Sequence, residues 1–126
     1  MEMIIGGAFQ GKGAYAKKKY PELVWAEGGT ICEEELWQAQ GVLNFQDYIR
    51  KEMQAGTDIS KLAGQLAEKN PEVVLVSCEV GYGVVPVDAF ERAYREAVGR
   101  VCTELAAKSR VVTRVICGIG TVIKHA

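Results

Sequence analysis

The sequence has few of the residues that build metal centres or membrane spans. Its 126 residues include one histidine, His125, and four cysteines, none of them in a C-x-x-C pair. Because structural zinc needs four closely spaced sulfur and nitrogen ligands, a zinc site is not expected. The longest apolar run, VVLV at 73–76, is far shorter than the roughly 20 residues that cross a bilayer. No membrane span is therefore expected.

A strong excess of charge is also missing. The chain carries 15 basic and 16 acidic side chains, for a net charge of −1. A general nucleic-acid binder needs a basic excess, so nucleic acid is not an expected partner. The cysteines show no disulfide pattern, which is typical of a reducing compartment and predicts a cytoplasmic protein with free thiols.

What the sequence does have is a high apolar content, 48%, in a length that suits one domain spanning residues 1–126. Strand-like and helix-like segments alternate, which predicts an α/β fold with a mainly parallel sheet flanked by helices. Strands are expected up to Ile5 and at 22–26, 41–45, 72–79 and within 110–124, and helices at 13–20, 30–40, 45–56, 57–71 and 87–109. Expected helix caps are Thr30, Thr57 or Asp58, and Asp88 with Glu91.

A glycine-rich stretch, IIGGAFQGKGAYAKKKY at 4–20, follows the first expected strand and contains the Gly-x4-Gly-Lys pattern of a phosphate-binding loop. In such a loop the glycines let successive backbone N–H groups point into one concavity, and the helix that follows adds its positive end. The lysine then reaches the outer phosphates. We therefore predict that nucleotide phosphates bind to Gly6, Gly7, Ala8, Phe9, Gln10, Gly11, Lys12 and Gly13.

The position after the lysine departs from the pattern. A serine or threonine there helps to hold Mg²⁺ in phosphoryl-transfer enzymes, and Gly13 has no hydroxyl. Phosphate binding is expected to survive this change, and metal-assisted transfer to suffer from it. A glycine-rich turn with an exposed lysine remains an alternative.

A second alternative is the dinucleotide fingerprint G-x-G-x-x-A, which Gly11, Gly13 and Ala16 match, with Glu27 after the second strand. That fingerprint begins where its strand ends, whereas Gly11 lies six residues beyond Ile5. A dinucleotide-dependent enzyme is therefore the less favoured interpretation.

A second motif, VVLVSCEVGYG at 73–83, places Glu79 directly after the most strand-like segment of the chain. Ligands of open α/β folds bind at the carboxyl ends of the strands. A carboxylate at that edge can hold a metal, a ribose hydroxyl or a base, or can accept from the N–H groups of its own loop.

Four segments of the chain carry a family resemblance: GGAFQGKG (6–13), CEVGYGVVP (78–86), AVGRVCTELAA (97–107) and CGIGTVIK (117–124). In these segments the chain resembles the adenosylcobinamide kinase / adenosylcobinamide-phosphate guanylyltransferase family, bifunctional enzymes that act late in cobalamin assembly. The family patterns include Gly-Gly-x-x-Ser-Gly-Lys-Ser and Asn-Glu-Val-Gly-x-Gly-Ile-Val-Pro. The resemblance is specific over about 71–124, good over 3–13, loose over 41–70 and absent over about 19–40.

The chain departs from the family at several catalytic positions. Gln10 and Gly13 replace two serines of the loop, Asn44 stands where the family has an acidic residue, and Cys78 replaces an asparagine. The family's guanylyltransferase step uses a histidine between the first helix and the strand at 41–45, and this chain has no histidine there.

The resemblance implies a phosphate-loop NTPase-like fold that binds GTP or ATP, with Mg²⁺, and a cobinamide-type acceptor. It assigns Lys12 and Glu79 to catalysis, and Asp47, one helical turn beyond Asn44, with Glu79 to the metal. Because of the departures we expect the guanylyltransferase step to be lost and the kinase step to be weakened. The alternative is a non-catalytic nucleotide-binding or interaction subunit on the same fold. The family also implies a homo-oligomer.

Overall fold

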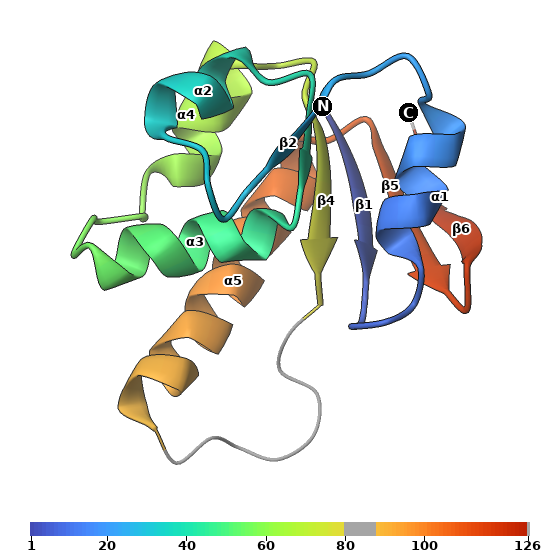
Figure 1. Cartoon of the computed structure of the whole chain (residues 1–126). Coiled ribbons are helices and arrows are strands. Elements are labelled where there is room, and N and C mark those ends of the chain that lie inside the picture. Colours follow the sequence, from blue (N-terminus) through green and yellow to red (C-terminus); the bar gives the residue numbers. More distant parts are fainter. Residues whose placement is uncertain (80–87, 126) are drawn as a thin grey trace.

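The computed structural model of the chain describes residues 1–79 and 88–125. Figure 1 shows the arrangement of their helices and strands. In chain order these are β1 (Glu2–Gly6), α1 (Lys12–Lys19), β2 (Trp25–Glu27), α2 (Glu33–Gln38), β3 (Gly41–Leu43), α3 (Phe45–Gln54), α4 (Leu62–Lys69), β4 (Val74–Cys78), α5 (Ala89–Lys108), β5 (Val111–Ile116) and β6 (Ile119–Lys124). The alternation expected from the sequence is confirmed.

The six strands form one sheet in the order β2-β3-β4-β1-β5-β6. Strands β1 to β5 pair in parallel, and β6 returns antiparallel to β5 through a tight turn. This mixed sheet, flanked by helices, confirms the predicted mainly parallel α/β class. The carboxyl ends of β1 and β4 lie side by side, with Gly6 in register with Cys78.

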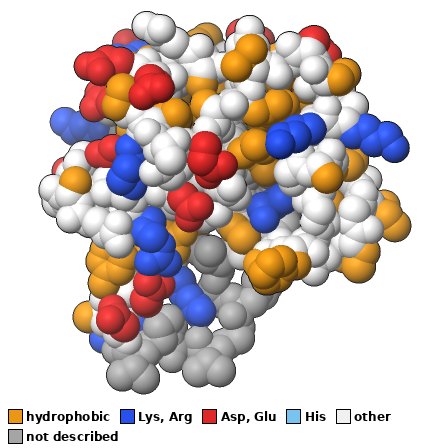
Figure 2. Space-filling model, in the orientation of Figure 1, with side chains coloured by type: hydrophobic (Ala, Val, Ile, Leu, Met, Phe, Trp, Pro, Cys, Tyr) orange, Lys and Arg blue, Asp and Glu red, His pale blue; other side chains and the backbone are white. Residues whose placement is uncertain are grey.

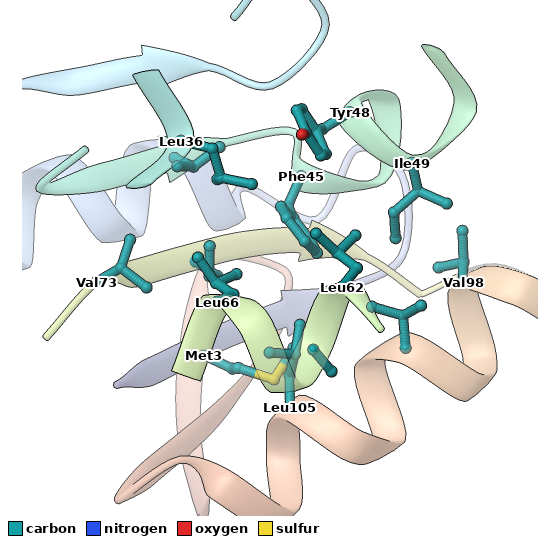
Figure 3. Packing of buried hydrophobic residues seen from close by; sticks show 14 of the residues in the cluster. Met3, Leu36, Phe45, Tyr48, Ile49, Leu62, Leu66, Val73, Val98 and Leu105 are labelled. Atoms are coloured by element: carbon teal, nitrogen blue, oxygen red, sulfur yellow. The ribbon is translucent and has the colours of Figure 1, made fainter. Parts of the chain in front are cut away.

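The helices are divided unequally between the two faces of the sheet. Helices α2 to α5 gather on one face, and α1 stands alone on the other (Figure 1). The larger core lies under α2 to α5, where Phe45, Leu66 and Leu105 are fully buried (Figure 3). Each side chain of this size contributes about 1.5–3 kcal/mol through burial. A smaller cluster under α1 is centred on Ile4 and Val76.

Two of the three predicted helix starts are wrong, and one is confirmed. Asp88 accepts a hydrogen bond from the backbone N–H of Glu91 and caps α5 as expected. Thr30 instead donates to the carbonyl of Glu27, and α2 begins later, after Cys32. Asp58 accepts from Ser60 in a turn that precedes α4. Polar residues of this kind stabilise turns as readily as helix ends, so the sequence signal was ambiguous.

No helix in residues 1–79 and 88–125 combines the length and the apolar composition that crossing a membrane requires.

Candidate functional site

The glycine-rich stretch forms a loop between the end of β1 at Gly6 and the start of α1 at Lys12. Gly11 precedes the helix in the left-handed conformation, with φ +82°, and its carbonyl accepts from the N–H of Tyr15 at 2.9 Å in the first helical turn. The first turn of α1 contains no acidic side chain. Backbone N–H groups and the positive end of the helix dipole are thus presented where the sequence predicted a phosphate site.

Close packing explains two of the loop glycines. A Cβ on Gly6 would lie 2.7 Å from the carbonyl oxygen of Val115, and one on Gly11 would lie 3.3 Å from the Cα of Gly118. Both contacts are with β5 or the β5–β6 turn, which therefore forms one wall of the loop.

Gln10 fastens the loop to the β5–β6 turn. Its side-chain oxygen accepts from the N–H of Cys117 at 2.7 Å, and its backbone oxygen accepts from the N–H of Gly118 at 2.7 Å. The residue that replaces a family serine therefore has a structural role here. Beside it, Phe9 has φ +62° and a fully exposed side chain.

Lys12 folds back across the loop toward β4. Its ammonium nitrogen lies 3.4 Å from the carbonyl oxygen of Gly7 and 3.4 Å from the sulfur of Cys78. Gly13 is different from the other loop glycines, since a Cβ there would meet no atom of residues 1–79 and 88–125 within 4 Å. The backbone thus leaves room for the hydroxyl side chain that this position lacks.

Glu27 is an acidic residue at the carboxyl edge of the sheet that the sequence did not connect with the phosphate loop. Asn44 follows β3 in a left-handed conformation, and its side-chain N–H₂ donates to both carboxylate oxygens of Glu27, at 3.0 and 3.2 Å. Glu27 ends β2, the strand beside β3. The sequence interpretation linked Glu27 only to a dinucleotide site. The sequence signal for its role was its position at the end of an expected parallel strand, because ligands bind at the carboxyl edge of such a sheet.

Asp47, in the first turn of α3, shares this environment. Desolvation by burial raises the pKa of its carboxyl above the usual value, and the charge of Glu27 raises it further. The positive charges of Arg50 and Lys12 act in the opposite direction. The charges of Glu27 and Lys12 therefore both act on the carboxyl of Asp47, whereas the sequence placed Asp47 with Glu79.

Glu79 lies at the same sheet edge, paired with a basic side chain of β5. Arg114 donates from Nε and Nη2 to the two carboxylate oxygens of Glu79, at 2.9 and 3.2 Å. The N–H of Glu79 also donates to the carbonyl of Gly6 at 2.7 Å, which joins the second motif to the loop. Arg114 was missed by the sequence interpretation. The glycines of that motif, Gly81 and Gly83, lie outside the described residues.

The shared metal site predicted for Asp47 and Glu79 stays a prediction. Among the residues that the structure describes, no three histidine, cysteine or acidic side chains are grouped as a metal site would require. The loop lies at the carboxyl ends of β1 and β4, with Lys12 directed toward Cys78, and phosphate binding by its residues stays a prediction.

A groove runs beside α1 from the loop. It has a volume of about 560 Å³ and is lined by Gly11, Ala14, Tyr15, Lys18, Lys19 and Gly118. On the face seen in Figure 2, basic side chains stand over α1 at the right, and acidic and basic side chains are mixed at the left. The groove thus combines positive charge with an aromatic ring.

Comparison with known proteins agrees with this arrangement. The profile of a family described as CobU, cobinamide kinase / cobinamide phosphate guanyltransferase, matches residues 29–123, which is most of the chain. The chain belongs to this family. The family match begins beyond the loop at 6–13, so the loop itself rests on its sequence and geometry.

Two curated relatives are each described as a bifunctional adenosylcobalamin biosynthesis protein CobU, one from Escherichia coli (strain K12) and one from Salmonella typhimurium (strain LT2). Each is 38% identical to this chain over 78 residues, which are 62% of the chain and 43% of the relative. The chain thus spans less than half the length of the curated CobU proteins that it matches.

Proposed function

We propose that this CobU-family chain binds the phosphates of GTP or ATP at residues 6–13 and acts in cobalamin biosynthesis or salvage. The observation that carries the proposal is the position of Gly11 and Lys12, a left-handed glycine followed by a lysine at the N-terminus of a helix, directly after a central parallel strand. This arrangement supplies N–H donors, a helix dipole and a mobile cation to one anion. The rest of the nucleotide extends along the groove beside α1, where Tyr15 offers a ring face and Lys18 a positive charge.

The proposed reaction is phosphoryl transfer to the hydroxyl of a cobinamide-type acceptor. The hydroxyl oxygen bonds to the γ-phosphorus while the bond to the bridging oxygen breaks, and the nucleoside diphosphate leaves with that electron pair. Lys12 stabilises the charge on the transferred group. The hydroxyl proton passes to Asp47, because its raised pKa brings it closer to the working pH of a general base. Glu79 is less suited, since Arg114 already engages both of its oxygens.

Mg²⁺ neutralises phosphate charge in such reactions when it is bound. Magnesium is commonly held by one or two carboxylates together with substrate phosphates, so the set of side chains that fits it here is reduced to Glu27, because Asp47 takes the proton. Gly13 and Asn44 add no hydroxyl and no charge to that set. The kinase step is therefore proposed to be slow. The guanylyltransferase step is proposed to be lost, because the segment between α1 and β3 contains no histidine.

A second candidate function is a nucleotide-binding subunit without catalysis. Gly13 and Asn44 favour it, because neither supplies the metal ligand that the family has at its position. The two functions differ in their dependence on Mg²⁺. Phosphoryl transfer to cobinamide, followed by mass spectrometry of the product, distinguishes them directly. Replacing Gly13 by Ser adds the missing hydroxyl where the backbone leaves space for it. An increase in turnover with Mg²⁺ supports the kinase, and the absence of product from both proteins supports the subunit.

The decisive experiment for the binding loop is nucleotide titration of Lys12→Ala. Loss of a charge-assisted contact worth about 1.5–3 kcal/mol weakens GTP and ATP binding by about 10- to 100-fold. Lys17→Ala, an exposed lysine on the same helix, is the matched control and leaves the affinity unchanged. Equal affinities of the wild type and Lys12→Ala would show that the loop is scaffold. Isothermal titration calorimetry with and without Mg²⁺ gives the affinities.

We further propose that the chain is one domain that self-associates. Strand β6 lies at the edge of the sheet, and its side chains Ile119, Val122 and Ile123 are exposed. An exposed apolar edge strand is a common site of pairing between chains. Light scattering that gives the mass of a single chain would contradict this.

A further inference from the structure

A cavity of about 370 Å³ lies between α5 and the sheet, on the face opposite α1. Its apolar walls are Ile5 of β1, Val98 and Cys102 of α5, and Ile123 of β6. Its size falls within the range of roughly 300–1,000 Å³ that small-molecule sites occupy.

The polar part of the cavity is the pair formed by Glu79 and Arg114. The two side chains neutralise each other through two hydrogen bonds, and the Glu79 side chain is only 14% exposed. A charged ligand entering these apolar walls would have to disturb that balance, which costs free energy in a poorly hydrated site. A hydroxyl suits the pair better, because it can donate to a carboxylate and accept from a guanidinium.

The cavity adjoins the proposed phosphate site. Cys78 lines it, and the sulfur of Cys78 lies 3.4 Å from the ammonium nitrogen of Lys12. Ile5, another wall residue, directly precedes Gly6, the first residue of the loop. A group held in the cavity is thus one side chain away from the lysine that would stabilise a transferred phosphoryl group.

One residue that lines the cavity, Gly99, is a poor helix former in the interior of a helix. Gly99 lies in the middle of α5 and lines the cavity. Glycine is much less favourable than alanine in a helix interior. A Cβ at this position would meet no atom of the described residues within 4 Å, so packing against them does not require the glycine. Because Gly99 has no side chain, the cavity is open along this part of α5, which is called the open wall below.

We propose that this cavity receives the neutral, hydroxyl-ended aliphatic arm of the phosphoryl acceptor, with the macrocycle of a cobinamide-type molecule outside. This inference rests on the proposed function, in which the nucleotide occupies the loop and the groove beside α1. The two ligands then approach the sheet edge from opposite faces. The hydroxyl meets the γ-phosphate near Lys12.

The test is to fill the open wall without harming the fold. Gly99→Leu introduces a better helix former that projects beside the cavity, and Gly64→Leu makes the same change at an exposed position of α4 that also has no neighbour within 4 Å. Calorimetry with cobinamide, in the presence and absence of GTP, is expected to show at least about tenfold weaker cobinamide binding for Gly99→Leu. Its GTP affinity and the cobinamide affinity of Gly64→Leu stay at the wild-type values.

A second measurement uses the wild-type chain. Cys102 lines the cavity, whereas Cys32 is exposed on α2's N-terminal side. Bound cobinamide is expected to slow alkylation of Cys102 by N-ethylmaleimide and to leave Cys32 unaffected, as measured by peptide mass spectrometry.

The outcomes separate the two proposals. Unchanged cobinamide affinity in Gly99→Leu, or no cobinamide binding by the wild type, overturns the cavity assignment while GTP binding still stands. Failure of GTP to bind overturns the proposed loop function, and cobinamide titration without GTP still tests the cavity.

Discussion

The two proposed binding regions, one on each side of the sheet, differ in construction. The loop and groove beside α1 are built largely from backbone, with Gly11 and the first turn of α1 supplying the geometry and Lys18 supplying charge. The cavity beside α5 is built from side chains of β1, β4, β5, β6 and α5, with an internally neutral ion pair. The loop still depends on particular side chains, because Gln10 fastens it to the β5–β6 turn and Gly6 and Gly11 leave no room for a Cβ.

The largest effect is expected on the α5 side, from Arg114→Ala. The change removes the guanidinium that neutralises the mostly buried Glu79 carboxylate. Because Arg114 itself is 42% exposed, the loss is placed at about 2 kcal/mol, below the 3–5 kcal/mol of a fully buried pair. Urea unfolding at neutral pH measures it. Arg110→Ala removes an exposed partner of Glu72 and should cost less than about 0.5 kcal/mol. Equal losses in the two variants would show that burial of the pair is unimportant.

The next largest effect is expected in the loop, from Gly11→Ala. An L-residue in the left-handed conformation costs about 1–2 kcal/mol, and the added Cβ would lie 3.3 Å from Gly118. The loop is expected to shift and GTP binding to weaken. Gly56→Ala is the matched control, with φ +80° and no neighbour within 4 Å. It should lose comparable stability in urea and keep full GTP affinity. Loss of GTP affinity in both variants would indicate a general effect of destabilisation.

The smallest effect is expected at Asp47 and depends on pH. Burial raises the pKa of Asp47 in the folded state above its usual 3.8, so the folded protein binds more protons than the unfolded chain between the two pKa values. The free energy of unfolding therefore falls as the pH rises through this interval. Asp47→Asn removes this loss of stability with rising pH. The variant should therefore have a higher free energy of unfolding than the wild type at neutral pH, and the two proteins should be equally stable below pH 3.8.

Asp58 provides the control for this pH dependence. A backbone hydrogen bond from Ser60 lowers the pKa of its exposed carboxyl. The contribution of Asp58 is therefore present at neutral pH and is lost as the pH falls through its lowered folded-state pKa. Asp58→Asn should shift the stability in the opposite direction from Asp47→Asn. Thermal melts across an acid-to-neutral pH series test this, and parallel shifts in the two variants would contradict it.

Much of the fold was predictable because its signals are local. The run at 73–76, rich in β-branched residues, predicted the buried strand β4, and the spacing of Phe90, Tyr94 and Val98 predicted the long helix α5. The glycine pattern predicted a turn between β1 and α1 in the same way. The predicted starts of α2 and α4 were wrong because short polar side chains such as that of Thr30 form hydrogen bonds in turns as readily as at helix ends.

Contacts between distant segments were not predictable from spacing. Nothing near Gln10 in the sequence indicates that it binds the N–H of Cys117, which is 107 residues away. Likewise, Glu27 meets Asn44 because β2 lies beside β3, and Arg114 of β5 meets Glu79 after β4 because only β1 separates these two strands. These pairings follow from strand order.

The sequence by itself determined the succession of strands and helices, the glycine loop ahead of Lys12 and the resemblance to the CobU family, because each is written in neighbouring residues. The tertiary structure decided which charges face one another. In it Glu27 lies beside Asn44, Glu79 pairs with Arg114, and the groove and the cavity lie on opposite faces of the sheet. Long-range electrostatics and cavity shape depend on how the strands are ordered, and that order is set when the whole core packs.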